Sequence, residues 1–211
     1  MISTIILDLG GVILNLDQNK TFEEFTRIGL GQEEMSEHEK MFHDFEKGLI
    51  NDSTFRNNIR SILKKELTDN QIDFAWNAML LDLPEERLSL IKQLQNKYEV
   101  YLLSNTNSIH ISAFDLYFNS VFENENWNAF FNKIYYSHQI NLRKPDTSIY
   151  EFVLNDIGKK PGECIFIDDN ESNIAGADKC GIRTILATQP LSEITMAQIN
   201  FFHSNLQRLN S

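Results

Sequence analysis

The feature of this sequence that most constrains its fold is a series of short apolar segments, each of which ends abruptly in polar residues. Segments of this kind lie at residues 3–7, 100–103, 133–136, 164–167 and 183–186. Short continuous apolar runs are typical of buried strands in parallel sheets. Between them lie amphipathic helical patterns, such as residues 85–97 and 172–179. This alternation predicts an α/β fold, a three-layer doubly wound parallel sheet with a Rossmann-like core.

One part of the chain does not follow this alternation. Residues 16–85 combine many charged and amide side chains with large apolar residues at helical spacing, and they carry no strand signal. Four helices are predicted there, around residues 22–28, 41–45, 55–63 and 72–79, with an N-cap offered by residues 51–53. We therefore expect a small all-helical cap domain at residues 16–85, and an α/β core domain made of residues 1–15 and 86–211.

Three further segments carry weaker patterns. Val12–Leu14 is predicted to be a short extended piece after the two glycines at positions 10 and 11. The aromatic-rich region Phe114–Phe131 is expected to be less regular and to pack into the core. The tail, Leu191–Ser211, is expected to form a last helix through Ile194, Ile199 and Phe202.

Charge and cysteine content limit the class of partner and the compartment. With 30 acidic and 19 basic residues the net charge is −11, which argues against nucleic acid as a partner. No run approaches the roughly 18 apolar residues of a membrane span, and the start of the chain reaches Asp8 before a secretory signal could form. Two cysteines, Cys164 and Cys180, fit a reducing compartment. We expect a cytoplasmic protein that is a monomer or a small homo-oligomer.

Polar clusters follow three of the predicted strands. These clusters are Asp8, Ser104-Asn105 and Asp168-Asp169, and a fourth, Arg143-Lys144, precedes a helix. The carboxyl ends of parallel strands meet at one edge of a sheet, where ligands bind. Carboxylates gathered there suit Mg²⁺, which binds one or two carboxylates together with waters and phosphate oxygens. An aspartate can also attack phosphorus directly, so the pattern indicates metal-assisted phosphoryl transfer.

Four stretches of the sequence then become recognisable. They are Ile6-Leu7-Asp8-Leu9-Gly10-Gly11-Val12, Leu102-Leu103-Ser104-Asn105-Thr106, Arg143-Lys144-Pro145-Asp146 and Phe166-Ile167-Asp168-Asp169-Asn170. In this order, and with a helical insertion after the first, they resemble the four motifs of the haloacid dehalogenase-like hydrolases and cover nearly the whole chain. The resemblance is closest to small bacterial sugar-phosphate phosphatases such as the α-D-glucose 1-phosphate phosphatases, whose motifs also run Asp-Leu-Gly and Ser-Asn-Thr-Asn.

The resemblance implies a nucleophile and a set of metal ligands. Asp8 would be the nucleophile and a ligand of Mg²⁺. The backbone carbonyl of Gly10 and the carboxylate of Asp169 would be further ligands. Asp168 would lie beside them, either as a direct ligand of the cation or as a residue that contacts one of the ligands.

The resemblance also implies how the substrate is held. Ser104 and the backbone at Asn105 would bind the transferring phosphoryl group, and Lys144 would neutralise that group and the nucleophile. The helical insertion would close over the site and select the substrate. Its segment Glu46–Phe55 resembles the specificity loop of such caps.

Position 10 departs from the family pattern. Phosphatases of this family usually carry a second aspartate two residues after the nucleophile, and here that residue is Gly10. A general acid or base typically contributes about 10²–10⁴-fold. Either the substrate has a good leaving group, as in a sugar 1-phosphate, or water or a residue such as Glu46 or His110 takes over the proton. A third alternative is a catalytically weak or inactive relative that binds a phosphorylated metabolite.

Two other reactions are weighed against this hypothesis. A phosphomutase would also require the acid that is absent at position 10. A 2-haloacid dehalogenase needs no metal, so the pair Asp168-Asp169 would put two unneeded charges beside the nucleophile. Because the phosphatases with the most similar motifs also carry glycine at this position, the main hypothesis is a Mg²⁺-dependent phosphatase that acts on a sugar phosphate.

Overall fold

The α/β part of the protein is built on one parallel sheet. The computed structural model describes residues 1–192 and 195–200, and this part of the chain holds a five-stranded sheet in the order β3-β2-β1-β4-β5. The strands are β1 (Thr4–Leu7), β2 (Glu99–Ser104), β3 (Lys133–Tyr136), β4 (Cys164–Asp168) and β5 (Arg183–Leu186). In the central strands Leu7 pairs with Leu102 on one side and with Ile167 on the other. The predicted doubly wound parallel sheet is confirmed.

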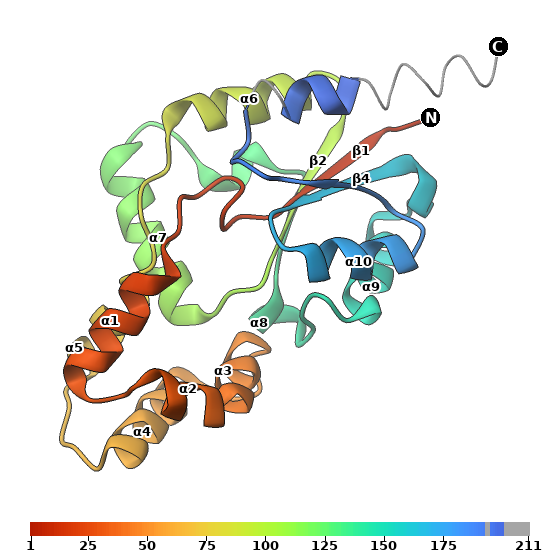
Figure 1. Cartoon of the computed structure of the whole chain (residues 1–211). Coiled ribbons are helices and arrows are strands. Elements are labelled where there is room, and N and C mark those ends of the chain that lie inside the picture. Colours follow the sequence, from red (N-terminus) through yellow and green to blue (C-terminus); the bar gives the residue numbers. More distant parts are fainter. Residues whose placement is uncertain (193–194, 201–211) are drawn as a thin grey trace.

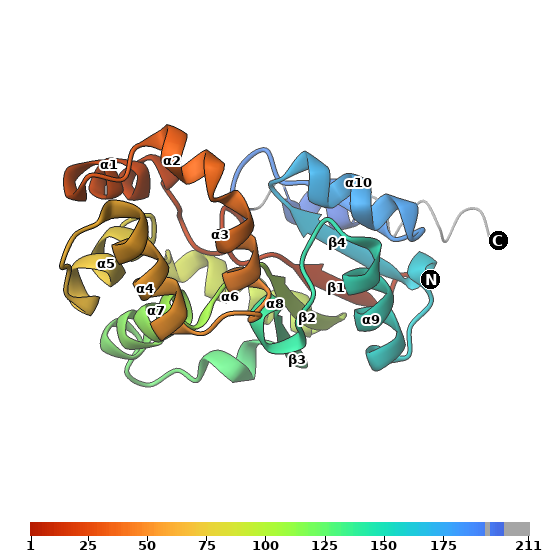
Figure 2. The ribbon, with the colours of Figure 1, turned by 90° about the horizontal axis from the view of Figure 1, so that it is seen from below.

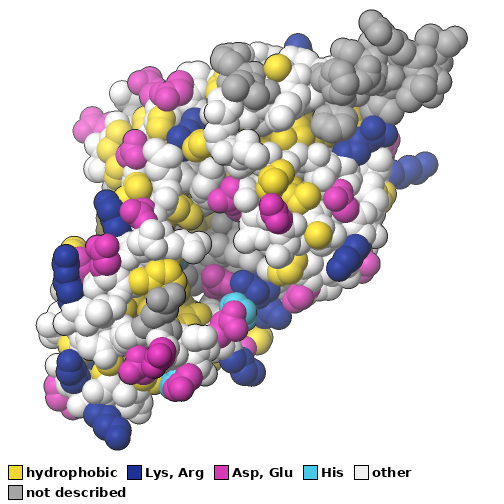
Figure 3. All heavy atoms as spheres, viewed as in Figure 1, with side chains coloured by type: hydrophobic (Ala, Val, Ile, Leu, Met, Phe, Trp, Pro, Cys, Tyr) yellow, Lys and Arg dark blue, Asp and Glu magenta, His cyan; other side chains and the backbone are white. Residues whose placement is uncertain are grey.

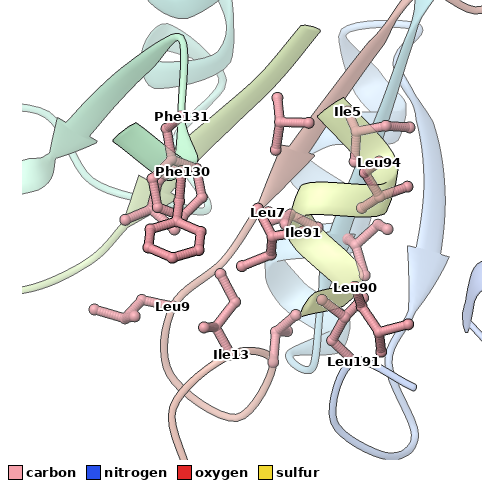
Figure 4. Close-up of a cluster of buried hydrophobic side chains, with 14 of the residues drawn as sticks. Ile5, Leu7, Leu9, Ile13, Leu90, Ile91, Leu94, Phe130, Phe131 and Leu191 are labelled. Atoms are coloured by element: carbon pink, nitrogen blue, oxygen red, sulfur yellow. The ribbon is translucent and has the colours of Figure 1, made fainter. Parts of the chain in front are cut away.

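Helices cover both faces of this sheet (Figure 1). On one face are α6 (Glu85–Gln95), α7 (Ser108–Val121) and the 3₁₀ turn η1 (Trp127–Phe130). On the other face are α9 (Thr147–Ile157) and α10 (Glu171–Lys179). Side chains alternate between the faces along each strand, so Ile5 and Leu7 pack with α6 (Figure 4), whereas Ile6 packs with α9 and α10. Three layers result.

Residues 18–77 form a separate group of helices, called here the helical block. It consists of α1 (Gln18–Ile28), α2 (Gln32–Glu37), α3 (Glu39–Glu46), α4 (Asp52–Leu63) and α5 (Asp69–Asn77). Figures 1 and 2 show these helices gathered at one end of the α/β part. They bury an aromatic cluster of their own, in which Phe45 and Phe55 stack with their ring centroids 4.3 Å apart.

Local sequence explains where several helices begin. The side chain of Asn51 accepts a hydrogen bond from the backbone of Thr54, as the predicted N-cap requires. Thr68 and Gln71 form a capping box at the start of α5. None of the helices in the described residues combines the length and the apolar content needed to cross a membrane.

Three expectations are corrected or limited by the structure. Val12–Leu14 is not extended: the backbone N–H groups of Ile13 and Leu14 both donate to Leu9 O at 2.8 Å, because the chain turns at the glycine pair. The region from Phe114 is regular as far as Val121, since it lies in α7; its aromatic side chains are nevertheless in the core, as expected. In the tail, residues 195–200 are helical, and Ile194 and Phe202 lie outside the described residues.

The aromatic cluster of the helical block generates a stability prediction. Phe55 is fully buried, with its ring centroid also 5.2 Å from that of Trp76. We expect Phe55→Ala to lower the free energy of unfolding by about 3–5 kcal/mol, because the site cannot fill the cavity that is left. Phe74→Ala is the matched control, since that side chain is 67% exposed, and it should cost less than about 0.5 kcal/mol. Urea denaturation followed by circular dichroism measures both; equal losses would contradict the prediction.

Candidate active site

The polar clusters predicted at the strand ends converge on one cavity. Asp8 follows β1, Ser104 ends β2 and Asp168 ends β4, and these three strands are neighbours in the sheet. A cavity of about 510 Å³ opens at their carboxyl ends. Of the residues predicted for the site, those that line it are Asp8, Gly10, Ser104, Asn105, Lys144 and Asp169. Figure 3 shows the molecule hollowed between the helical block and the α/β part, with acidic and basic side chains gathered there.

A buried lysine joins two of the strand ends. The Lys144 side chain is 1% exposed, and its Nζ lies 2.7 Å from both Asp8 Oδ1 and Asp168 Oδ2. Nζ also donates to the backbone oxygen of Leu103 at 2.9 Å. Burial alone would lower the pKa of Lys144, but the two carboxylates outweigh it and the pKa is raised. The ammonium therefore stays charged beside Asp8.

Asp8 is held in a setting that is unfavourable for a lone charge. Burial raises the pKa of Asp8, the ammonium of Lys144 opposes this shift, and the charge of Asp168 adds to it. Further positive charge at this position would favour the carboxylate. A nucleophilic aspartate must be ionised, so the site suits a nucleophile that depends on Lys144 and on a cation.

Asp168 is fully buried, and its oxygens are occupied by protein donors. They accept from Asn173 Nδ2 at 3.0 Å and from the backbone N–H of Asn170 at 2.8 Å, in addition to Lys144. Burying a carboxylate is costly unless its oxygens find such donors. The contacts place Asp168 under the floor of the cavity, where it anchors Lys144.

Three carboxylates form a cluster that could hold a metal ion. One oxygen from each of Asp8, Asp168 and Asp169 lies within 4.8 Å of the others. Asp169 lines the cavity, and burial raises its pKa, with a further contribution from the charge of Asp168. Oxygen donors with open positions are the coordination that Mg²⁺ prefers. The chemistry of this donor set therefore fits Mg²⁺, and Asp8 and Asp169 are the carboxylates on the cavity side.

A glycine allows Asp169 to come close to the first turn. Gly11 has φ +73°, and a Cβ atom there would lie 2.1 Å from Asp169 Oδ2. The left-handed backbone favours glycine, and any side chain at this position would have to displace the Asp169 carboxylate. The second glycine of the motif is thus required by the acidic cluster.

Ser104 and Asn105, the other predicted phosphate-binding residues, also line the cavity. Ser104 is buried at the end of β2. The Asn105 side chain exchanges two hydrogen bonds with the backbone of Lys144, each 2.9 Å long. This amide therefore positions the lysine, and Asn105 also lines the cavity. The family resemblance implies a phosphate-binding role for the backbone of Asn105, whereas its side chain bonds the backbone of Lys144.

Position 10 lies beside the apolar side chain of Leu16. A Cβ atom at Gly10 would lie 2.4 Å from Leu16 Cδ1, and Leu16 lines the cavity. The first turn of the site is therefore apolar where a second aspartate would stand.

The two residues suggested as substitutes both line the cavity, but each is otherwise engaged. Glu46 is paired with Arg143, with Oε2 2.9 Å from Nη2. His110 stacks on Trp76 and its Nδ1 lies 2.8 Å from Asn77 Oδ1. Burial lowers the pKa of His110 to about 3, so the imidazole is neutral at neutral pH.

Sequence reasoning missed most of the wall contributed by α3. Glu39, His43 and Glu46 all line the cavity, and only Glu46 was considered. Their spacing of four and three residues puts them on one helical face, whereas Phe42 and Phe45 of the same helix are buried in the helical block. The sequence spacing could have shown that these three residues share a helical face. It does not show which surface of the protein this face meets.

The turn between α3 and α4 is docked on the α/β part beside α8 (Ser137–Ile140). Ser137 Oγ donates to the backbone oxygen of Glu46 at 2.6 Å, and Asn141 Nδ2 donates to that of Lys47 at 2.8 Å. Gly48 has φ +66°, and a Cβ atom there would lie 2.1 Å from the backbone oxygen of His138. The helical block is thus held against the α/β part at the edge of the cavity.

Comparison with known families agrees with this geometry. The family model of the haloacid dehalogenase-like hydrolases matches residues 2–181, which include every cluster described above. A D-ribitol-5-phosphate phosphatase from Bacteroides thetaiotaomicron is 32% identical over 189 residues, which are 87% of this chain and 91% of the relative.

Solved structures give the same result. A haloacid dehalogenase family enzyme from Bacteroides thetaiotaomicron, a magnesium complex, has a TM-score of 0.81 and 39% identity, covering 87% of this chain and 92% of the other. A structure of such an enzyme from the same organism, in complex with magnesium and inorganic phosphate, has a TM-score of 0.77 and 38% identity, covering 88% of this chain and 93% of the other. The structure of a hydrolase of this type from Porphyromonas gingivalis has a TM-score of 0.79 and 34% identity, covering 88% of this chain and 90% of the other. The chain belongs to the haloacid dehalogenase-like hydrolase family.

Proposed function

We propose that this hydrolase is a Mg²⁺-dependent phosphatase that acts on a small sugar or polyol phosphate through an aspartyl-phosphate on Asp8. The enzyme is a haloacid dehalogenase-like phosphatase, and Mg²⁺ is its cofactor. The observation that carries the proposal is the ammonium of Lys144, 2.7 Å from both Asp8 and Asp168 beside a third carboxylate. The similar D-ribitol-5-phosphate phosphatase supports a polyol phosphate as substrate. With both cysteines free, we place the enzyme in the cytoplasm.

In the first step the carboxylate of Asp8 attacks the phosphorus in line with the leaving oxygen. Its Oδ1 is held by Lys144 at 2.7 Å, which keeps the carboxylate oriented and charged for the attack. The P–O bond to the leaving group breaks, and its electron pair goes to the leaving oxygen. Ser104 and the backbone at Asn105 orient the phosphoryl group. Mg²⁺ held by Asp8, Asp169 and the carbonyl of Gly10 would supply the remaining positive charge for the phosphoryl oxygens.

In the second step water attacks the phosphorus of the aspartyl-phosphate. The bond to the Asp8 oxygen breaks, the carboxylate is restored and inorganic phosphate leaves. Lys144 faces the same carboxylate before and after both steps, so it stabilises the charge on Asp8 without moving.

We assign residues 16–85 to a cap domain and residues 1–15 and 86–211 to the core domain. The contacts of the α3–α4 turn support this division, because they hold the helical block over the cavity. The polar face of α3 would then meet the hydroxyl groups of the substrate while the core holds its phosphate. Closure of such a cap excludes water from the reaction.

The nucleophile is tested by Asp8→Asn, which preserves shape and removes the charge. Phosphate release from D-ribitol 5-phosphate and α-D-glucose 1-phosphate should require Mg²⁺, and should fall at least about 10³-fold in the variant. Asp115→Asn, an exposed change on α7, is the matched control. Turnover that persists in Asp8→Asn or without divalent cation would refute the proposal. Tight binding of these compounds by the wild type without any turnover would favour a non-catalytic relative.

The cation site is tested at Gly11. In Gly11→Ala the added methyl group must push Asp169 away, and we expect the affinity for Mg²⁺ to fall at least about tenfold. Gly158→Ala is a matched control, because Gly158 also has positive φ (+67°) but nothing within 4 Å of a Cβ atom. Isothermal titration calorimetry measures both; equal affinities would remove Asp169 from the cation site.

Cap closure is tested at Gly48. In Gly48→Ala the methyl group would meet the backbone oxygen of His138, so the α3–α4 turn can no longer dock. We expect kcat/KM for D-ribitol 5-phosphate to fall roughly tenfold or more, because the cap no longer positions the substrate. Gly158→Ala should leave it unchanged, and a Gly48→Ala enzyme with wild-type kcat/KM would show that docking of this turn has no part in catalysis.

A further inference from the structure

We propose that His43, on α3 of the helical block, is the catalytic acid that protonates the leaving oxygen of the substrate. The inference rests on the phosphatase function proposed above and adds a residue to it. It follows from which proton donors line the cavity and which of them are free to give up a proton.

An alkyl phosphate needs such a donor. An alkoxide is a poor leaving group, and protonation by a positioned acid typically contributes about 10²–10⁴-fold. The turn that carries Asp8 has glycine at position 10, beside the apolar side chain of Leu16, and so offers no acidic group there. The side chains that can supply the proton stand on the other walls of the cavity.

Three other groups on the cavity wall are already committed. Lys144 is shared between two carboxylates at 2.7 Å. Glu46 is held by Arg143 at 2.9 Å. His110 is neutral, and its Nδ1 faces the side-chain oxygen of Asn77 at 2.8 Å.

Unlike these groups, His43 is partly exposed on the cavity wall. It lines the cavity, and its side chain is 37% exposed, so a substrate can reach it. Its Nε2 lies 3.6 Å from Glu39 Oε1, one helical turn earlier, which is an ion-pair distance when the imidazole is protonated. Histidine is also the side chain that most often serves as a general acid or base in enzymes. Glu39 would therefore orient the ring while the other ring nitrogen, Nδ1, gives the proton.

In the proposed reaction His43 gives a proton during ester cleavage and takes one back during hydrolysis of the aspartyl-phosphate. As the P–O bond breaks, its electron pair stays on the leaving oxygen, and the proton of the imidazolium passes to that oxygen to give the free alcohol. The neutral imidazole of His43 then takes a proton from the water that attacks the aspartyl-phosphate. The oxygen of that water bonds to phosphorus, Asp8 leaves as the carboxylate, and His43 is again protonated. The sum is phosphate ester plus water giving alcohol plus inorganic phosphate.

The experiment compares His43→Gln with the wild type on two substrates that differ in their leaving groups. D-Ribitol 5-phosphate must expel an alkoxide, whereas p-nitrophenyl phosphate expels a phenolate that needs no proton. Because kcat/KM reports only the steps up to cleavage of the ester, we expect it to fall about 10²-fold with D-ribitol 5-phosphate and to stay within about threefold with p-nitrophenyl phosphate. The variant should also release p-nitrophenolate in a burst, since His43 is missing as the base of the second step.

A second histidine of the helical block provides the control. His38→Gln changes a histidine of the same block that does not line the cavity, and both rates should stay at the wild-type level. An equal loss on both substrates in His43→Gln would assign this residue to binding or folding and overturn the proposal, as would an unchanged rate with D-ribitol 5-phosphate. If the wild type hydrolyses neither substrate, it is the phosphatase function itself that fails.

Discussion

The structure of this site depends on one buried ammonium between two carboxylates. Lys144 has almost no contact with solvent, and Asp8 and Asp168 pair with its ammonium at 2.7 Å. Removing one partner of a buried ion pair leaves an unpaired charge, which is strongly destabilising. The two aspartates can flank one lysine because β1 and β4 are adjacent and parallel and end at the same level. The sheet order is thus tied to the chemistry through a single side chain.

The lysine in turn needs its own support. It arrives from the segment after α8, and no strand of the sheet carries it. Asn105 fixes the backbone of Lys144 by two hydrogen bonds from the end of β2. Asn105, which the sequence suggests as a substrate ligand, therefore places the charged group that faces Asp8.

The sequence predicts this α/β part well because the relevant signals are local. Apolar runs ending in Asp8, Ser104 and Asp168 identify parallel strands, and the parallel arrangement alone brings their ends together. The structure confirms that convergence. It also corrects the segment after Gly11 and the region from Phe114, where a tight turn and a buried helix with aromatic residues on its inner side give ambiguous local patterns.

The side of the cavity formed by the helical block was predictable only in outline, because it is defined by contacts between distant parts of the chain. Ser137 lies 91 positions from Glu46, which it contacts, and Asn141 lies 94 positions from Lys47. No periodicity within α3 reveals which surface its polar face will meet. The same is true of Leu16, whose place beside Gly10 follows from how the chain leaves the first turn.

The charges of the cavity make cation and substrate binding interdependent. Two carboxylates line it and a third, Asp168, lies just beneath, on a chain of net charge −11, and a phosphate dianion placed there alone would be repelled. Lys144 offsets only part of that charge, since it already compensates two of the three. A bound cation lowers the electrostatic cost of the phosphate, and by linkage the phosphate must strengthen cation binding to the same extent. Acidic residues that would exclude a phosphate ester by themselves thus become, with a cation present, the reason that the two bind together.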